Sequence, residues 1–134
     1  MTIQNEELFM GSLWDWGILN GCFGNTKIKP TDVDGLVERN GHFLVLEAKR
    51  PGVKIKAGQW WTINALRNTG LFTTIIIWGE RNQPVQMQVI YPIPYAPKQP
   101  EKAGITELRD IVSRWFQYAE KKRRSEANAN SIRR

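Results

Sequence analysis

Residues 34–49 read DGLVERNGHFLVLEAK, and they decide the fold because they contain two β-prone runs joined by Asn40-Gly41. An Asn-Gly pair between two such runs is the strongest short-range signal for a β-hairpin. Arg50-Pro51-Gly52 follows the second run directly and ends it, since proline and glycine interrupt strands. We therefore predict one strand over residues 34–39 and an antiparallel partner over residues 42–49.

A two-residue turn also determines which side chains of this hairpin face one another. Pairing proceeds symmetrically outward from the turn, so Asp34 lies opposite Glu47, with Cβ atoms about 4.5–5.5 Å apart. Lys49 is two residues beyond Glu47 and points to the same face. Asp32 would lie opposite Lys49 if the pairing continued that far. We therefore expect these charged side chains to gather on one face at the open end of the hairpin.

Two interpretations of this charged cluster follow from electrostatics. Two carboxylates at that separation repel each other, and a shared divalent cation would remove the repulsion. Alternatively, Asp34, Glu47 and Lys49 form a salt-bridge cluster at the end of a sheet, exposed to solvent and without a chemical role. Charged residues that end two otherwise apolar strands need one explanation or the other.

Elements on both sides of the hairpin define the fold class. Apolar side chains predict a helix over residues 4–19 and a last helix that begins near Thr106, after an extended proline-rich connector. A further helix over residues 57–68 is closed by Gly70. A nearly all-apolar run predicts a strand over residues 71–78 that is buried on both faces. Residues 85–91 alternate as a strand nearer an edge does. The order helix, hairpin, helix, strand, strand, helix predicts an α/β domain with a mixed sheet.

Positive charge is concentrated at the C-terminal end of the chain. The 134 residues carry a net charge of +6, and residues 114–134 contain seven basic residues against Glu120 and Glu126. Such a concentration is compatible with contacts to the phosphates of nucleic acid, and equally with a solvated helix end. The candidates for phosphate contacts in this region are Lys121, Lys122, Arg123 and Arg124.

The remaining composition excludes several classes of protein. Cys22 is the only cysteine, which excludes an intramolecular disulfide and a thiolate metal cluster. No signal peptide is visible, and no apolar run approaches the roughly 20 residues that a membrane span needs. We therefore expect an intracellular, cytoplasmic protein without a membrane partner. His42, the only histidine, is expected to be an exposed polar residue beside the turn rather than a general base.

Asp34, a gap of twelve residues and then Glu47-Ala48-Lys49 resemble the signature of the PD-(D/E)xK nucleases, and residues 30–35 resemble its first half. The spacing and flanking strands look like those of archaeal Holliday-junction resolvases and small stand-alone phage nucleases. The resemblance covers residues 4–91. It implies a restriction-endonuclease-like core with a central mixed sheet of about four strands, in the order α-β-β-α-β-β-α.

The resemblance also implies boundaries and site roles. Residues 1–105 would form the nuclease core, and residues 106–134 would add a C-terminal helix with a basic tail to the same domain. Asp34, Glu47 and the backbone carbonyl of Ala48 would ligate Mg²⁺ or Mn²⁺. Lys49 would steady the attacking water and the charge that develops on the phosphate. The cation would lower the pKa of a bound water and neutralise charge during in-line displacement. Ligands that are all oxygen suit Mg²⁺ better than Zn²⁺.

Further residues are implied by the same resemblance, each with an alternative. Glu6 or Glu7 is a candidate outer metal ligand, although acids near a helix N-terminus also suit the helix dipole. Gln59, on the helix after the Lys49 strand, is a further candidate site residue. Pro30 stands two residues before Asp32, which makes Asp32 a rival for the role of Asp34. The hairpin register favours Asp34, and a β-bulge would overturn that preference.

Lys54 and Lys56 follow the hairpin directly and are candidates for contacts with backbone phosphates, or ordinary surface lysines. The expected function is that of a metal-dependent endonuclease that cleaves DNA and recognises structure rather than sequence. Small relatives often pair two sites, so a homodimer is a candidate state. The alternatives are a non-catalytic nucleic-acid-binding or anti-defence protein on the same fold, and an RNA nuclease.

Overall fold

The computed structural model describes residues 14–123, and the chain divides into two units, Met1–Asp32 and Val33–Arg134. In the described part of the first unit the only helical element is the 3-10 helix η1, Gly17–Leu19. The predicted helix over residues 4–19 lies outside the described residues in its first part, and it is wrong for residues 14–16. Trp16 has a φ of 64°, a left-handed conformation that cannot continue a right-handed helix.

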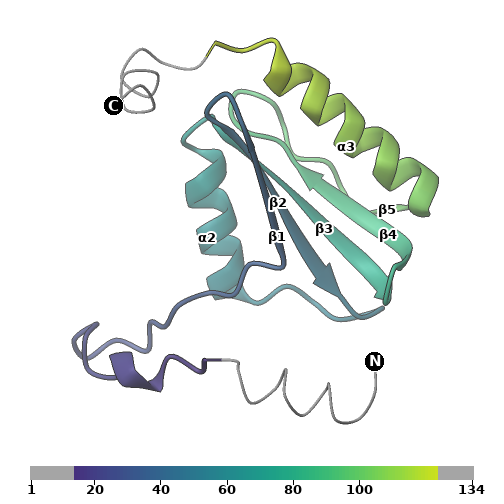
Figure 1. Cartoon of the computed structure of the whole chain (residues 1–134). Helices are drawn as coiled ribbons and strands as arrows, with labels where there is room; N and C mark the ends of the chain where they lie inside the picture. Colours follow the sequence, from purple (N-terminus) through teal and green to yellow (C-terminus); the bar gives the residue numbers. More distant parts are fainter. Residues whose placement is uncertain (1–13, 124–134) are drawn as a thin grey trace. The chain divides into compact units, whose positions relative to one another are not determined.

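The second unit is built on one five-stranded mixed sheet with the strand order β1-β2-β3-β4-β5 (Figure 1). Strands β2 and β3 are parallel, and every other neighbouring pair is antiparallel. The strands are β1 Gly35–Arg39, β2 His42–Lys49, β3 Phe72–Glu80, β4 Gln83–Ile90 and β5 Glu101–Lys102. The helices are α2 Ala57–Arg67, which connects β2 to β3, and α3 Ile105–Glu120, which follows β5. The α/β class and the mixed sheet are therefore confirmed.

The hairpin has the predicted turn and the predicted register. Asn40 and Gly41 both have positive φ, 52° and 81°, as a two-residue hairpin turn requires. Arg39 pairs with His42, and the pairing continues outward without a shift to Gly35 and Leu46, where β1 ends. This hairpin therefore contains no β-bulge that would change which residues of the two strands lie opposite each other.

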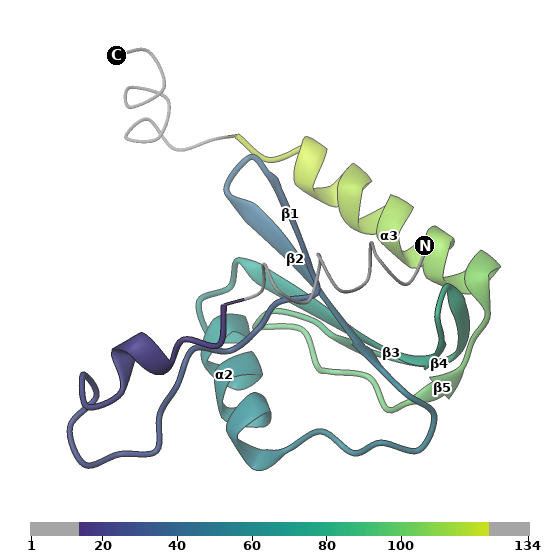
Figure 2. The same cartoon turned by 60° about the horizontal axis from the view of Figure 1, so that its bottom comes forward.

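The two faces of the sheet carry separate hydrophobic cores, each covered by one helix (Figure 2). On one face Ile63 of α2 packs with Ile76 and Ile90. On the other face Trp115 and Ala119 of α3 pack against a cluster from the sheet that includes Leu44, Ile75 and Val89. Strand β3 contributes to both cores, as its nearly all-apolar sequence predicts.

The sheet differs from the prediction at its β4 and β5 end. The predicted sheet has about four strands, whereas the proline-rich connector forms a fifth, β5, which pairs with Gln86 and Met87 of β4. Strand β3 extends to Glu80 through an irregularity at Trp78/Gly79. A Cβ at Gly79 would lie 2.2 Å from the carbonyl oxygen of Gln83, so this close approach of two strands requires glycine.

No helix within residues 14–123 has the length and apolar character that crossing a membrane would require.

Candidate functional site

Asp34 and Ala48 are hydrogen-bonded to each other at the open end of the hairpin. The Ala48 N–H donates a 2.8 Å hydrogen bond to Oδ2 of Asp34. In a continued ladder this N–H would bond to residue 33, but β1 begins at Gly35, so the carboxylate takes the place of the missing strand. Because a strand residue directs its N–H and C=O toward the same neighbour, the Ala48 carbonyl faces the same edge as Asp34.

Glu47 is held on the α2 face of the sheet by two neighbours. Nζ of Lys49 lies 3.5 Å from its Oε1, and Nε2 of Gln59 donates to the same oxygen at 3.4 Å. The side chains of Glu47 and Lys49 are only 15% and 19% exposed. Glu47 pairs in register with Ile76, a core residue under α2, which explains the burial.

Gln59 reaches Glu47 from the first turn of α2. Its Oε1 accepts a 3.4 Å hydrogen bond from the backbone N–H of Lys56, the residue that caps the helix. This bond orients the amide, so the Nε2 donor is directed to Glu47. A single glutamine therefore links the start of α2 to the end of β2.

The electrostatic environment of Glu47 opposes its negative charge. Burial raises the pKa of this carboxyl, and the negative charge of Asp34 raises it further, whereas Lys49 and Gln59 act in the opposite direction. An added cation between Asp34 and Glu47 would compensate both the lost hydration and the repulsion. The first interpretation of the charged cluster is therefore consistent with this environment.

The chemistry of the donor set fits Mg²⁺ or Mn²⁺. Asp34, Glu47 and the Ala48 carbonyl offer only oxygen, and Mg²⁺ typically takes one or two carboxylates and completes its shell with water and substrate phosphate. Within residues 14–123 no three His, Cys, Asp or Glu side chains converge in a way that could hold a metal ion. Glu6 and Glu7, the predicted outer ligands, lie outside the described residues.

Asp32, the rival to Asp34, is not paired with Lys49 in the sheet. Strand β1 begins at Gly35, so the ladder stops before it reaches residue 32. The ion pair of Lys49 is with Glu47 instead. The observed geometry therefore favours Asp34 as the acid at the end of the hairpin.

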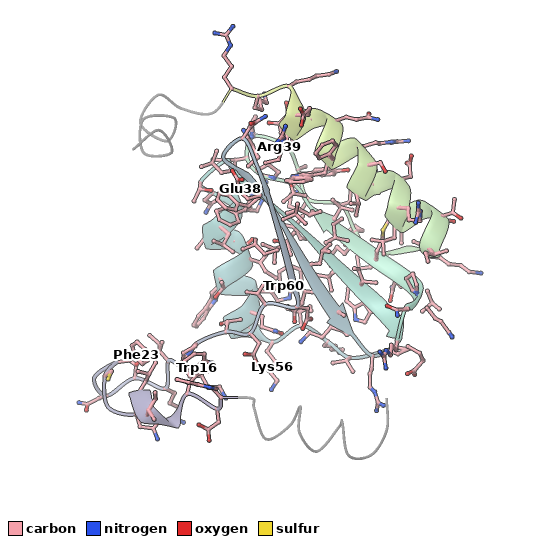
Figure 3. All side chains as sticks on the ribbon, in the orientation of Figure 1. Trp16, Phe23, Glu38, Arg39, Lys56 and Trp60 are labelled. Atoms are coloured by element: carbon pink, nitrogen blue, oxygen red, sulfur yellow. The ribbon has the colours of Figure 1, made fainter. Side chains whose placement is uncertain are left out.

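Lys54 and Lys56 lie in the exposed segment between β2 and α2. Nε1 of Trp78 donates a 2.7 Å hydrogen bond to the Val53 carbonyl, which fixes this segment against the end of β3. Neither lysine forms an ion pair in the part of the chain that the structure describes. Figure 3 shows Lys56 at the end of the second unit opposite to the hairpin tip, where Arg39 lies.

Two further basic residues, Arg50 and Arg81, lie beside Lys49 and were not predicted from the sequence as site residues. A cavity of about 320 Å³ is lined by Ala48, Lys49 and Arg50, by Glu80 at the end of β3 and by Arg81 in the turn between β3 and β4. Arg81 stands in a turn between two predicted strands, and nothing in its local sequence marks it. Only the parallel pairing of β2 with β3 brings this turn to the Lys49 end of the sheet.

The basic residues at the end of α3 lie at the other end of the hairpin. Nδ2 of Asn40, in the turn, donates to the carbonyls of Ala119 and Glu120 at 3.1 and 3.2 Å. Strand β2 runs from this turn to Lys49, a length of about 23 Å at ~3.3 Å per residue. The structure therefore does not bring the end of α3, with Lys121, Lys122 and Arg123, to the candidate site, and Arg124 is outside the described residues.

Comparisons of the chain with models of protein families, with curated proteins and with solved structures find no match.

Proposed function

We propose that the protein is a metal-dependent endonuclease that hydrolyses phosphodiester bonds in DNA, and that its sheet and helices form a restriction-endonuclease-like core. The observation that carries the proposal is the convergence of Asp34, Glu47 and the Ala48 carbonyl at one strand end, with Lys49 and Gln59 held against Glu47. A structural salt bridge would not require a buried carboxylate next to a second acid. Two acids that share a cation account for that arrangement.

Asp34, Glu47 and the Ala48 carbonyl would hold Mg²⁺ or Mn²⁺. The cation would supply positive charge against the phosphate and make water a stronger nucleophile. Asp34 is fixed through Oδ2 by the Ala48 N–H, and its other carboxylate oxygen would bind the cation. Glu47 is fixed by Gln59, which would act as a positioning residue through its hydrogen bond to Glu47.

Lys49 is the residue best suited to contact the reacting phosphate. Its side chain is largely buried and its Nζ lies 3.5 Å from Oε1 of Glu47, so its position is restricted before substrate binds. From there it can donate hydrogen bonds to a phosphate oxygen and to the attacking water. Fixed donors of this kind stabilise developing negative charge better than mobile surface lysines do.

The substrate is proposed to be selected by shape. The cations near the site, Arg50, Lys54, Lys56 and Arg81, can contact phosphates, which carry no sequence information. Reading of sequence needs contacts to base edges instead. Branched or partly single-stranded DNA is therefore the preferred substrate of this proposal.

Cleavage assays with single-stranded, duplex and four-way-junction DNA and with single-stranded RNA test the proposal. We expect cleavage with Mg²⁺ or Mn²⁺ and none with chelator. Lys49→Ala should lower the rate by about 100-fold or more, since one lost donor to the developing charge costs roughly 10²–10³. Lys102→Ala, which removes the same charge from exposed strand β5, is the matched control and should leave the rate unchanged.

The proposal fails if folded protein cuts none of these nucleic acids under any metal condition. Binding without cleavage would then support the alternative of a non-catalytic nucleic-acid-binding protein. Cleavage of RNA alone would replace the DNA substrate by RNA and keep the roles of Asp34, Glu47 and Lys49.

A further inference from the structure

A cavity of about 470 Å³ lies on the α3 face of the sheet, opposite to the face that carries Glu47 and Lys49. Its walls come from β3, from the segment after β4 and from α3. The lining includes four aromatic and two polar side chains, namely Tyr91, Tyr95, Trp115, Tyr118, Thr73 and Arg114. The volume is in the range of binding sites for small organic groups.

Tyr95 presents an aromatic ring to solvent from a fixed backbone. Tyr95 is 58% exposed. The segment that carries it is clamped by Arg67, whose Nε and Nη2 donate to the carbonyls of Tyr91 and Tyr95 at 2.9 and 2.5 Å. A rigid exposed ring loses little conformational entropy when a ligand stacks on it.

The inner wall of the cavity combines an aromatic surface with a hydroxyl group. Trp115 is 7% exposed and Thr73 is 6% exposed, so both line the cavity from its buried side. Within residues 14–123 the Thr73 hydroxyl takes part in no hydrogen bond. It can donate to or accept from the polar edge of a planar ligand.

Two basic side chains, Arg114 and Lys122, lie at the α3 wall of the cavity. Arg114 lines it and forms an exposed ion pair with Asp110 at 3.0 Å, one that water and competing anions can replace. Nζ of Lys122 lies 4.5 Å from the centre of the Tyr118 ring. Residues 114–123 contain four basic residues and one acidic residue. The ligand that fits is a planar ring attached to a negatively charged chain.

We propose that this cavity binds an unpaired nucleobase of single-stranded nucleic acid, which stacks on Tyr95 while neighbouring phosphates contact Arg114 and Lys122. The inference rests on the proposed function for its nucleic-acid ligand but does not depend on cleavage. Since the cavity and Glu47 lie on opposite faces of the sheet, the bound base belongs to an unpaired segment away from the bond that is cut. A second copy of the chain fits less well, because a symmetric contact here would bring like charges together.

Fluorescence anisotropy with two oligonucleotides of equal length, measured in chelator, tests the proposal. One is oligothymidylate, and the other has the same phosphates but abasic sugars, so only the bases differ. Wild-type protein should bind the base-containing strand at least about five-fold more tightly, the effect of one stacked base. Tyr95→Ala should lose this difference, and Tyr95→Phe, which keeps the ring, should retain it.

Phe116→Ala is the matched control, because Phe116 is an exposed aromatic residue of α3 that does not line the cavity. It should retain the preference for the strand with bases. Equal affinity of wild-type protein for the two strands overturns the inference, and so does a preference that survives in Tyr95→Ala. A dimer in light scattering that Tyr95→Ala dissociates also overturns it, because a second copy then occupies the cavity.

Cleavage plays no part in this measurement, so its outcome is independent of the nuclease assay. If the protein prefers the strand with bases but cleaves no nucleic acid, the base-binding cavity is supported and only the nuclease proposal is refuted. Cleavage together with equal affinity for the two strands would refute only the cavity.

Discussion

At the residue scale, the carboxylate of Asp34 has two roles. Its Oδ2 accepts the Ala48 N–H and so ends the ladder between β1 and β2. Its charge acts on Glu47, whose pKa it raises. The first task needs only an oxygen acceptor, whereas the proposed binding of a cation needs the charge. An amide substitution therefore separates the two.

In Asp34→Asn, the amide oxygen can accept the Ala48 N–H in place of the carboxylate. The free energy of unfolding without metal should therefore change by less than about 1 kcal/mol, the usual contribution of one such hydrogen bond. Mn²⁺ should raise the Tm of the wild-type protein, because a ligand that binds only the folded state stabilises it. The same concentration should leave the Tm of Asp34→Asn nearly unchanged.

Asp110→Asn, which removes an acid from α3 far along the chain from the site, is the control and should keep the wild-type response to Mn²⁺. An equal rise in Tm for wild type and Asp34→Asn would show that the cation binds elsewhere.

At the scale of the elements, the side chain of Asn40 connects the hairpin turn to the end of α3. Asn40 has a φ of 52°, and its Nδ2 donates to the carbonyls of Ala119 and Glu120 at the end of α3. Arg39 adds hydrogen bonds of 2.6 and 2.9 Å to Glu120, which lower the pKa of that exposed carboxyl. The turn thus supplies donors to the last carbonyls of the helix, which have no partners within the helix.

Asn40→Ala should lower the free energy of unfolding by about 3–4 kcal/mol, from a left-handed residue at ~1–2 kcal/mol and two lost hydrogen bonds at ~1 kcal/mol each. Asn40→Gly should cost less, because glycine keeps the turn conformation and loses only the contacts with α3. Midpoints of urea unfolding measure both. The order of the two variants separates backbone strain from helix capping.

Asn82 offers a matched control in the turn between β3 and β4. Its φ is 59°, close to that of Asn40, and its side chain forms no hydrogen bond among residues 14–123. Asn82→Ala should therefore show the backbone cost alone. If it destabilises the protein as much as Asn40→Ala, the bonds from Asn40 to α3 contribute nothing.

At the scale of the whole molecule, one histidine should link stability to pH. His42 lies in β2 with its ring 5.4 Å from the Tyr118 ring, in an edge-on contact across to α3. Burial lowers the pKa of His42 from its ordinary 6.5, and the nearby charge of Lys122 lowers it further. The folded state therefore binds a proton less readily than the unfolded state.

The sign of the pH effect follows from this lowered pKa. The contribution of His42 to stability is complete above pH 6.5, where the ring is neutral in both states, and decreases as the pH falls toward the lowered pKa. We expect the free energy of unfolding to fall between about pH 7 and pH 5. His42→Phe keeps an aromatic ring and should show a smaller fall over the same range.

Nuclear magnetic resonance gives an independent measurement, since the chain has a single histidine. The titration of His42 should have its midpoint below pH 6.5, and Lys122→Gln should move it upward. A midpoint at or above 6.5 would show that the ring is not shielded between β2 and α3.

Local sequence by itself determined the hairpin, its register and the identity of the residues at its open end. Turn chemistry at Asn40-Gly41 acts over a few residues, and a two-residue turn leaves one register for the strands. Strand β3 and helices α2 and α3 were predictable for a similar reason, because each signal is local: an apolar run in β3, Gly70 after α2 and helical spacing in α3. The conformation of Trp16, which contradicts the predicted helix, has no such periodic signal.

Only the tertiary structure decided how the elements meet. The approach of Gln59 to Glu47, the arrival of Arg81 beside Lys49 and the aromatic cavity under α3 all join segments that are far apart in the chain. They depend on the parallel pairing of β2 with β3 and on which face each helix covers. Such contacts follow from side-chain packing over the whole sheet, and the local patterns that form a turn or a helix contain no information about them.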